Sequence, residues 1–395
     1  MSSATHSTDF EQKSLIDTLR TILRLSRGLI SIPLRYGNNP SEVISLALAL
    51  LEVSYNPALL SNDLWTSLTD EAEKILALSD FLSPVGAPFC RIFAVKGLTP
   101  RAPRNWDGVA RQFRESKLLM KVLENWTSLF FYDMLVPMMG KGRTPTPSEG
   151  GSTARRKQMS LKKLLIQRDG WISLVGKMMD ESAPPEVQPV RRGYGGVTLQ
   201  AAHIVPFSAN GHSLLRKMLA KFVGQDMEGL LTGESINDPS NALLLDALTH
   251  AAFGLFKFSV ECQDDRYFFR KFAPNRKLPS EVLRHRNNEE IIFGQASRSV
   301  ARPLPLLCNL HHAIARVLWA SGAAENIAKA LADEDELKDW HMEGDYWHRV
   351  SASYLQRELR ALPGLDELAI DGQDDTEDLY TEERNRASSR HTVVT

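Results

Sequence analysis

Two histidines and one asparagine are the residues of this chain whose types and spacing could do chemistry. A short apolar segment that starts at Leu199 carries His203, and Pro206 closes this segment. Asn241 opens a second apolar run, and His250 lies nine residues after it. This pattern predicts a short strand that delivers His203, a loop at Asn241 and the start of a helix at His250.

These side chains could together hydrolyse a phosphodiester bond. An imidazole with a pKa near neutrality can take a proton from water. A divalent cation can stabilise the charge on the scissile phosphate and on the leaving oxygen. An asparagine side chain can fix a loop through paired hydrogen bonds and so keep a base and a metal in register.

The sequence AHIVP (202–206), followed by an Asn-x8-His pattern that ends in HAAFG (250–254), resembles the HNH endonuclease motif. The fold of that family is a ββα-metal finger. More narrowly, the chain resembles the HNH nuclease domain proteins of fungi, because RDG (168–170) is similar to the helix end that precedes their first strand. Gly176-Lys177 resembles their following turn. The resemblance covers about residues 140–330.

The resemblance implies a role for each of the three residues. His203 would be the general base, Asn241 the loop-fixing residue of the catalytic site, and His250 a ligand of a divalent metal ion (Mg, Mn or Zn). Two positions depart from the family pattern. Ala202 stands where many HNH nucleases carry a metal ligand, and Ile172-Ser173 stands where the usual cysteine would fall.

A cation held by His250 alone would bind weakly, so the departures leave alternatives open. Gln200, Asp246 or a substrate phosphate could complete the metal shell, or His203 could itself be a ligand. Two functions from different classes follow. The first is a metal-dependent endonuclease that acts on DNA, and the second is an HNH-fold interaction module that has lost catalysis and tight metal binding.

Positive charge gathers near the motif although the chain as a whole has a net charge of −1. A nucleic-acid partner would therefore have to be held by local features. The candidates for contacts to DNA phosphates are Lys162, Lys163, Arg168, Arg191 and Arg192. A solvated basic face without a ligand is the alternative interpretation of the same residues.

Composition describes the protein that must position these groups. The 395 residues are 43% hydrophobic and 24% charged, which is ordinary for a globular protein. The three cysteines form no CxxC pair and indicate an intracellular protein, nuclear or cytoplasmic. No apolar run is long enough to predict a membrane span. The fold class expected is α+β and mainly α-helical, with a ββα core.

Local patterns predict the order of the parts along the chain. Helices are expected over residues 11–34, 41–53, 62–82 and 107–136, and a strand over 89–95. In the adjacent pair His311-His312, the two side chains should point in different directions, so at least one should be structural. The predicted organisation is an N-terminal helical region (1–138), a linker (139–160), the HNH-like domain with its C-terminal helix (161–335), a helical extension (336–365) and a disordered acidic tail (366–395).

Overall fold

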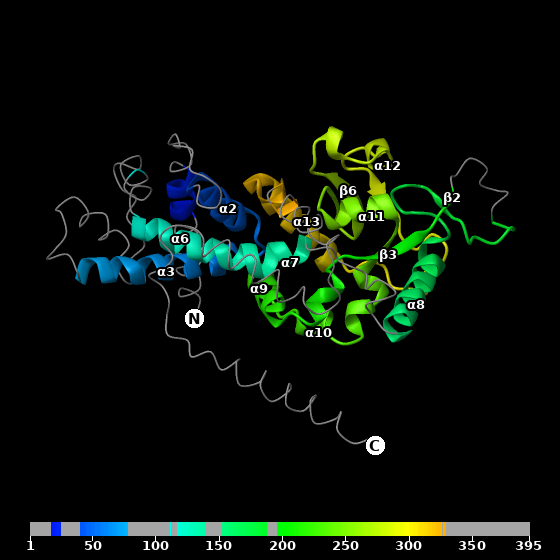
Figure 1. The fold of residues 1–395 in the computed structure, drawn as a ribbon, viewed down its shortest axis with the longest axis horizontal. Coiled ribbons are helices and arrows are strands. Elements are labelled where there is room, and N and C mark those ends of the chain that lie inside the picture. Colours follow the sequence, from blue (N-terminus) through cyan, green and yellow to red (C-terminus); the bar gives the residue numbers. More distant parts are fainter. Residues whose placement is uncertain are drawn as a thin grey trace, which may run out of the picture. The chain divides into compact units, whose positions relative to one another are not determined.

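The computed structural model describes residues 17–24, 40–77, 111, 117–139, 152–187, 196–325 and 327–328. The expected strand over 89–95, the helical extension and the acidic tail lie outside these residues. The described elements are mainly helices with a few small sheets (Figure 1), which confirms the predicted α+β class. Among the described helices, none combines the length and the apolar character that a membrane span requires.

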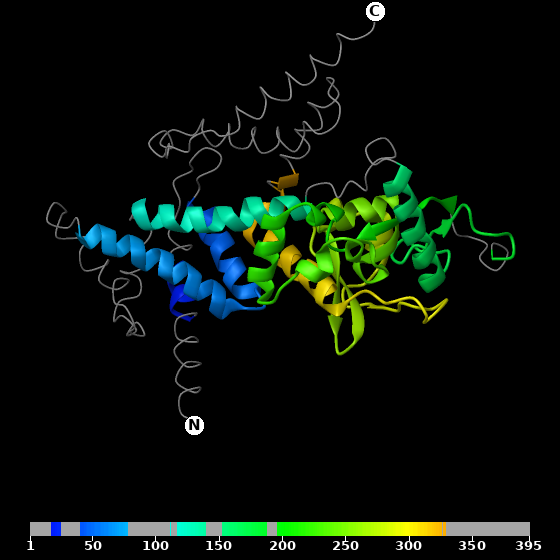
Figure 2. The same cartoon turned by 90° about the horizontal axis from the view of Figure 1, so that it is seen from below.

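The N-terminal helices form where the sequence pattern predicts them. Residues 17–24 are helical, α2 runs over Pro40–Val53, and α3 runs over Pro57–Ala77, which is earlier than expected at its start. Helix α6 (Lys117–Phe130) continues through the π-helical turn η2 (Phe131–Leu135) into α7 (Val136–Met139). Helices α3 and α6 lie side by side (Figure 2). Helix α8 (Ser152–Asp169) begins inside the segment that was expected to be a linker.

The ββα unit consists of β3 (Leu199–His203), β4 (Ala242–Asp246) and α11 (Ala247–Gly254). The two strands are antiparallel, with His203 opposite Ala242. All five residues of β4 are buried because both faces of the hairpin are covered. On one face, Leu161 and Leu165 of α8 pack against Leu199 and Leu244. On the other face, Leu243 and Leu245 belong to the main core.

Further short elements complete this part of the chain. They are β1 (Met179–Asp180), β2 (Gly196–Val197), α9 (Ser213–Val223), α10 (Glu228–Leu231), β5 (Phe258–Gln263), β6 (Arg266–Lys271), α12 (Ser280–Arg284), β7 (Glu290–Ile291) and α13 (Pro305–Ser321). Strands β5, β6 and β7 form one antiparallel sheet in that order. The free edge of β5 is closed by Asn309 of α13, whose side chain bonds both N and O of Cys262.

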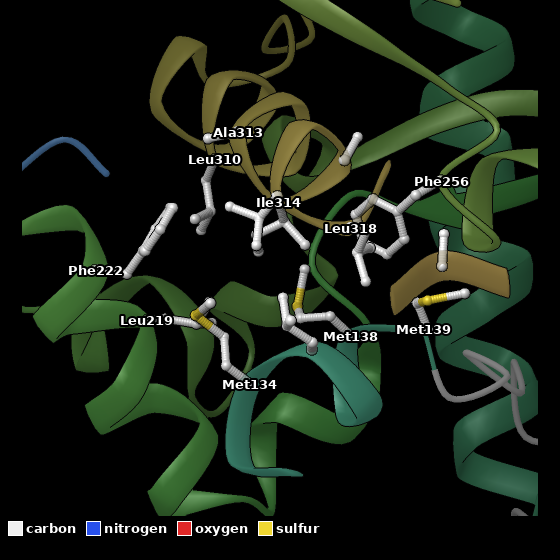
Figure 3. Close-up of a cluster of buried hydrophobic side chains, with 14 of the residues drawn as sticks. Met134, Met138, Met139, Leu219, Phe222, Phe256, Leu310, Ala313, Ile314 and Leu318 are labelled. Carbon is white, nitrogen blue, oxygen red and sulfur yellow. The ribbon is translucent and has the colours of Figure 1, made fainter. Parts of the chain in front are cut away.

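Helix α13 contacts both α2 and β5, and β5 in turn contacts α11 of the ββα unit. Figure 3 shows the apolar cluster that results. Met134 and Met138, from the η2–α7 segment, lie beside Leu219 of α9 and Ile314 of α13. The N-terminal helices and the ββα unit therefore share one hydrophobic core.

Both residues of the histidine pair in α13 are structural. The His311 ring stacks between Phe253 and Phe256, with centroid distances of 3.9 and 4.2 Å. The His312 Nδ1 lies 2.9 Å from the Oγ of Ser259. Because Phe253 belongs to α11, the His311 stack ties the helix of His250 to α13.

Acid is expected to weaken this stack. Burial lowers the pKa of His311 to about 3, which is below the value of about 6.5 for an unfolded chain. Between these values the unfolded state binds the extra proton, so stability rises with pH and is lost as pH falls below 6.5. The shifted pKa of His311 should therefore lower the free energy of unfolding by about 2 kcal/mol when the pH falls from 7 to 5.

Urea unfolding at several pH values measures this effect. In His311→Gln, the loss of unfolding free energy on acidification should be smaller by that amount, although the variant is less stable at pH 7. Equal pH slopes for the two proteins would show that His311 does not couple folding to protons.

Candidate active site

The ββα unit brings His203, Asn241 and His250 together although the first two are far apart in sequence. His203 ends β3, and Asn241 directly precedes β4, so strand pairing makes them neighbours. His250 lies in α11, which follows β4 without a gap and contacts both strands. Strand pairing and one tight strand-to-helix junction therefore build the site.

Asn241 clamps the chain on either side of the site. Its Oδ1 accepts a hydrogen bond from Val205 N (2.9 Å), and its Nδ2 donates to Val205 O (3.1 Å) and Ile236 O (3.0 Å). The Asn241 backbone oxygen also accepts from Ile204 N (2.8 Å). The side chain is almost completely buried. It fixes the turn that follows His203 to the loop that precedes Asn241.

Removing this clamp should cost stability. Asn241→Ala leaves three buried backbone groups without their partner, and each orphaned group costs about 1–3 kcal/mol. We expect a clear drop in the free energy of unfolding in urea, together with a loss of any cleavage activity. Asn287→Ala is the matched control, because Asn287 accepts one exposed bond from Lys271 N and should be nearly neutral. If Asn241→Ala melted like the control and kept full activity, the clamp would not have this role.

His203 is half-buried and is held by a residue that the sequence pattern did not identify. Its Nε2 lies 3.1 Å from Oδ1 of Asn237, and its ring lies 6.1 Å from that of Phe207. Burial lowers the pKa of His203 to about 4, the bond to Asn237 acts in the opposite direction, and the proximity of His250 lowers it further. The imidazole is therefore neutral near pH 7 and can accept a proton.

His250 is also half-buried and hydrogen-bonded. Its Nδ1 lies 2.7 Å from Oε1 of Gln200. Burial lowers its pKa, and the nearby Asp246 carboxylate acts in the opposite direction. When Nδ1 donates its proton to Gln200, Nε2 keeps a free lone pair. Metal-binding histidines are commonly oriented by such a bond at their other ring nitrogen.

Asp246 is not available as a metal ligand because it caps α11. Its Oδ1 accepts from Thr249 N (3.0 Å), and its Oδ2 accepts from the hydroxyls of Thr249 (2.7 Å) and Ser173 (2.8 Å). A Cβ on Gly176 would clash with Oδ2 of Asp246, so only glycine allows this close approach. Ser173 and Gly176 therefore hold the cap of the helix that carries His250.

The donors around His250 fit weak binding of one ion and do not fit a tightly held resident metal. Among the residues that the structure describes, no three His, Cys, Asp or Glu side chains lie close enough to hold a metal. Ala202 is buried and offers no donor. Gln200 is engaged with the His250 ring. Among the described residues, the Nε2 of His250 is the donor that its bond to Gln200 leaves free, and the other ligands would have to come from His203, water or substrate.

The expectation that Arg168 contacts DNA is wrong, because its guanidinium is fully buried. All five of its N–H groups are used. Nε and Nη2 donate to Asp169, Nη1 to Pro239 O and Ala301 O, and Nη2 to Ala242 O. Gly170 ends the helix with a φ of +85°, which favours glycine. The RDG sequence is therefore a structural element that holds the backbone on both sides of Asn241.

The other basic candidates differ in exposure. The Lys162 ammonium forms a 2.6 Å ion pair with the buried Asp180. Burial opposes ionisation of Asp180, but hydrogen bonds from Lys162 and Ser182 outweigh it and lower its pKa. Lys163 is exposed on α8. Arg191 and Arg192 lie outside the described residues. Lys163 is thus the described candidate whose charge faces solvent.

Asn237, Gln200 and Ser173 are the site residues that sequence reasoning did not assign. Gln200 was considered only as a direct metal ligand, and Ser173 only as the place of a missing cysteine. The one signal for Asn237 was its position four residues before Asn241, in a segment without periodicity. None of the three lies next in sequence to the group that it binds.

Comparison with known families agrees with this geometry. Residues 182–261 match the family model described as HNH endonuclease. The match supports a relationship of this segment to the HNH superfamily. The searches of curated proteins and of solved structures gave no significant match.

The HNH segment contains β2, β3, α9, β4 and α11, and therefore His203, Asn241 and His250. HNH domains generally use divalent metal ions and act on nucleic acids, so a nuclease-like, hydrolytic function is supported in general terms. Arg168 and α8 lie outside the matched residues. Although they precede the HNH segment in the sequence, their buried contacts support it.

Proposed function

We propose that this protein is an endonuclease that hydrolyses DNA phosphodiester bonds, with His203 as the general base. The observation that carries the proposal is the geometry of the ββα unit, in which the Asn241 clamp fixes the turn after His203 and the adjoining helix α11 carries His250. The RDG element and the turn at Gly176 also fit a relationship to the HNH nuclease domain proteins of fungi, which is part of the proposal.

In the proposed reaction, His203 removes a proton from a water molecule as the water oxygen attacks phosphorus. The new P–O bond forms as the P–O bond to the leaving oxygen breaks, and the leaving oxygen finally takes a proton from solvent. Asn241 keeps the His203 turn in place during this step. A general base of this kind typically accelerates the reaction by about 10²–10⁴-fold.

A divalent cation (Mg, Mn or Zn) is part of the proposal as an ion recruited together with the substrate. His250 would offer Nε2 as its protein ligand, and water and phosphate oxygens would supply the others. Such an ion would stabilise negative charge on the phosphate. Lys163, with Arg191 and Arg192 from the adjoining segment, would contact DNA phosphates without reading the base sequence.

Plasmid nicking by the purified full chain tests the proposal. The reaction is compared in EDTA and in added Mg²⁺, Mn²⁺ or Zn²⁺, and supercoiled DNA is separated from nicked and linear forms. We expect nicking that requires an added metal and that weakens with salt, because phosphate contacts are electrostatic. Intact plasmid under every metal condition would contradict an endonuclease function.

The same site also supports a second candidate, an HNH-fold interaction module without catalysis. Ala202 contributes no ligand, and the described residues hold no group of three metal-binding side chains. The segment between α9 and β4, from which Asn237 reaches His203, carries Asp226, Glu234 and Asp238, and their negative charge disfavours a phosphate backbone. An inactive protein that still binds DNA or protein partners would favour this candidate.

A further inference from the structure

We propose that Asn237 is a positioning residue that fixes the ring tautomer of His203, so that Nδ1 is the nitrogen that accepts the proton. This inference rests on the proposed function, because it assigns the catalytic nitrogen of the proposed base. The tautomer itself can be measured without any cleavage assay.

The bond between the two side chains defines the tautomer. The Asn237 Oδ1 is a pure acceptor, and His203 Nε2 lies 3.1 Å from it, so Nε2 carries the hydrogen and donates. A neutral imidazole has a single N–H, which leaves the lone pair on Nδ1. An amide oxygen accepts this bond without adding a negative charge beside the ring. The imidazole can therefore be oriented while it stays neutral.

Asn237 is itself held by the clamp that holds His203. The Asn241 Nδ2 donates to Ile236 O, the residue before Asn237, and to Val205 O, two residues after His203. The Asn237 backbone N–H donates to Glu234 O (3.0 Å), which closes a short 3-10 turn. One buried amide thus sets the separation between the acceptor oxygen of Asn237 and the ring of His203.

The buried Arg168 holds the same arrangement from the other side. Its guanidinium donates to Pro239 O and Ala242 O, which flank Asn241 in sequence. The backbone around Asn237 is therefore fixed by two buried side chains, those of Asn241 and Arg168. Rigid support of this kind is what a residue needs in order to keep a base within reach of water.

Long-range ¹H–¹⁵N correlation NMR on the full chain with labelled histidine tests the tautomer. The chain has ten histidines, so the His203 signals are assigned by their loss in His203→Gln. In the wild type we expect a protonated Nε2 and an unprotonated Nδ1. A protonated Nδ1 on His203 would overturn the proposal, whether or not the protein cleaves DNA.

Variants test the positioning role. Asn237→Ala should lower kcat by about 10- to 100-fold with little change in KM, as part of what the base contributes, and should speed exchange of the Nε2 hydrogen with water. Asn237→Asp keeps an acceptor oxygen and should restore the protected Nε2–H. Asn210→Ala is the control, since its Oδ1 accepts from Gly233 N in the same loop without touching His203.

The outcomes separate this inference from the proposed function. Active wild type with unchanged kcat in Asn237→Ala would overturn the positioning role and leave the nuclease function standing. An inactive wild type would overturn the nuclease function, and the NMR tautomer would still decide what Asn237 does to the ring. Equal kcat losses in Asn237→Ala and Asn210→Ala would mean that loop anchoring, and not the bond to His203, matters.

Discussion

His203→Ala is expected to reduce metal-dependent DNA cleavage by about 10²–10⁴-fold while the protein remains folded. The side chain carries the neutral imidazole of the site and donates its bond to Asn237. It is half-buried and lies outside the apolar clusters of the core, so its removal should change stability little. The measurement is the initial rate of plasmid nicking at saturating metal, with circular dichroism of the same preparation.

The control for this result is a half-buried histidine elsewhere in the protein. His312→Gln keeps a side chain able to bond Ser259 and lies on α13, outside the site. It should retain the wild-type nicking rate. Nicking by purified His203→Ala at the wild-type rate would show that another group is the base or that the activity is a contaminant.

Arg168→Met is expected to destabilise the fold by about 3–5 kcal/mol, because breaking a buried ion pair leaves its partner charge uncompensated. The Asp169 carboxylate would lose two bonds, although it would still accept from Gly294 N. The carbonyls of Pro239, Ala242 and Ala301 would lose their donor as well. Methionine has a similar length, so the loss of hydrogen bonds dominates over a loss of volume.

Equilibrium unfolding in urea measures this effect. Arg266→Met is the matched control, because Arg266 is paired with Glu290 on the exposed face of β6 and should change stability far less. If Arg168→Met were as stable as Arg266→Met but bound DNA more weakly, Arg168 would be a phosphate contact after all. A large loss of stability in Arg168→Met, but not in Arg266→Met, would confirm that Arg168 holds the backbone around Asn241 in place.

Sequence alone determined the parts of this protein that depend on neighbours in the chain. The spacing of His203, Asn241 and His250 predicted a strand, a loop and a helix, and the structure has β3, the turn before β4 and α11 at these places. The helix at Pro40–Val53 follows from a proline at the first turn and a continuous apolar run. The α+β class follows from the same local patterns.

Only the tertiary structure decided which polar groups meet. Asn237 and His203 are 34 residues apart, Arg168 and Ala242 are 74 apart, and Ser173 and Asp246 are 73 apart. A basic residue at a helix end has the same sequence pattern whether it faces water or a buried carboxylate. Arg168 is buried because α8 packs against the β3–β4 hairpin, and that packing brings the carbonyls of Pro239 and Ala242 to its guanidinium. The third carbonyl, that of Ala301, comes from the segment before α13. Hydrogen-bond partners are chosen by the approach of distant segments, which periodicity along the chain does not encode.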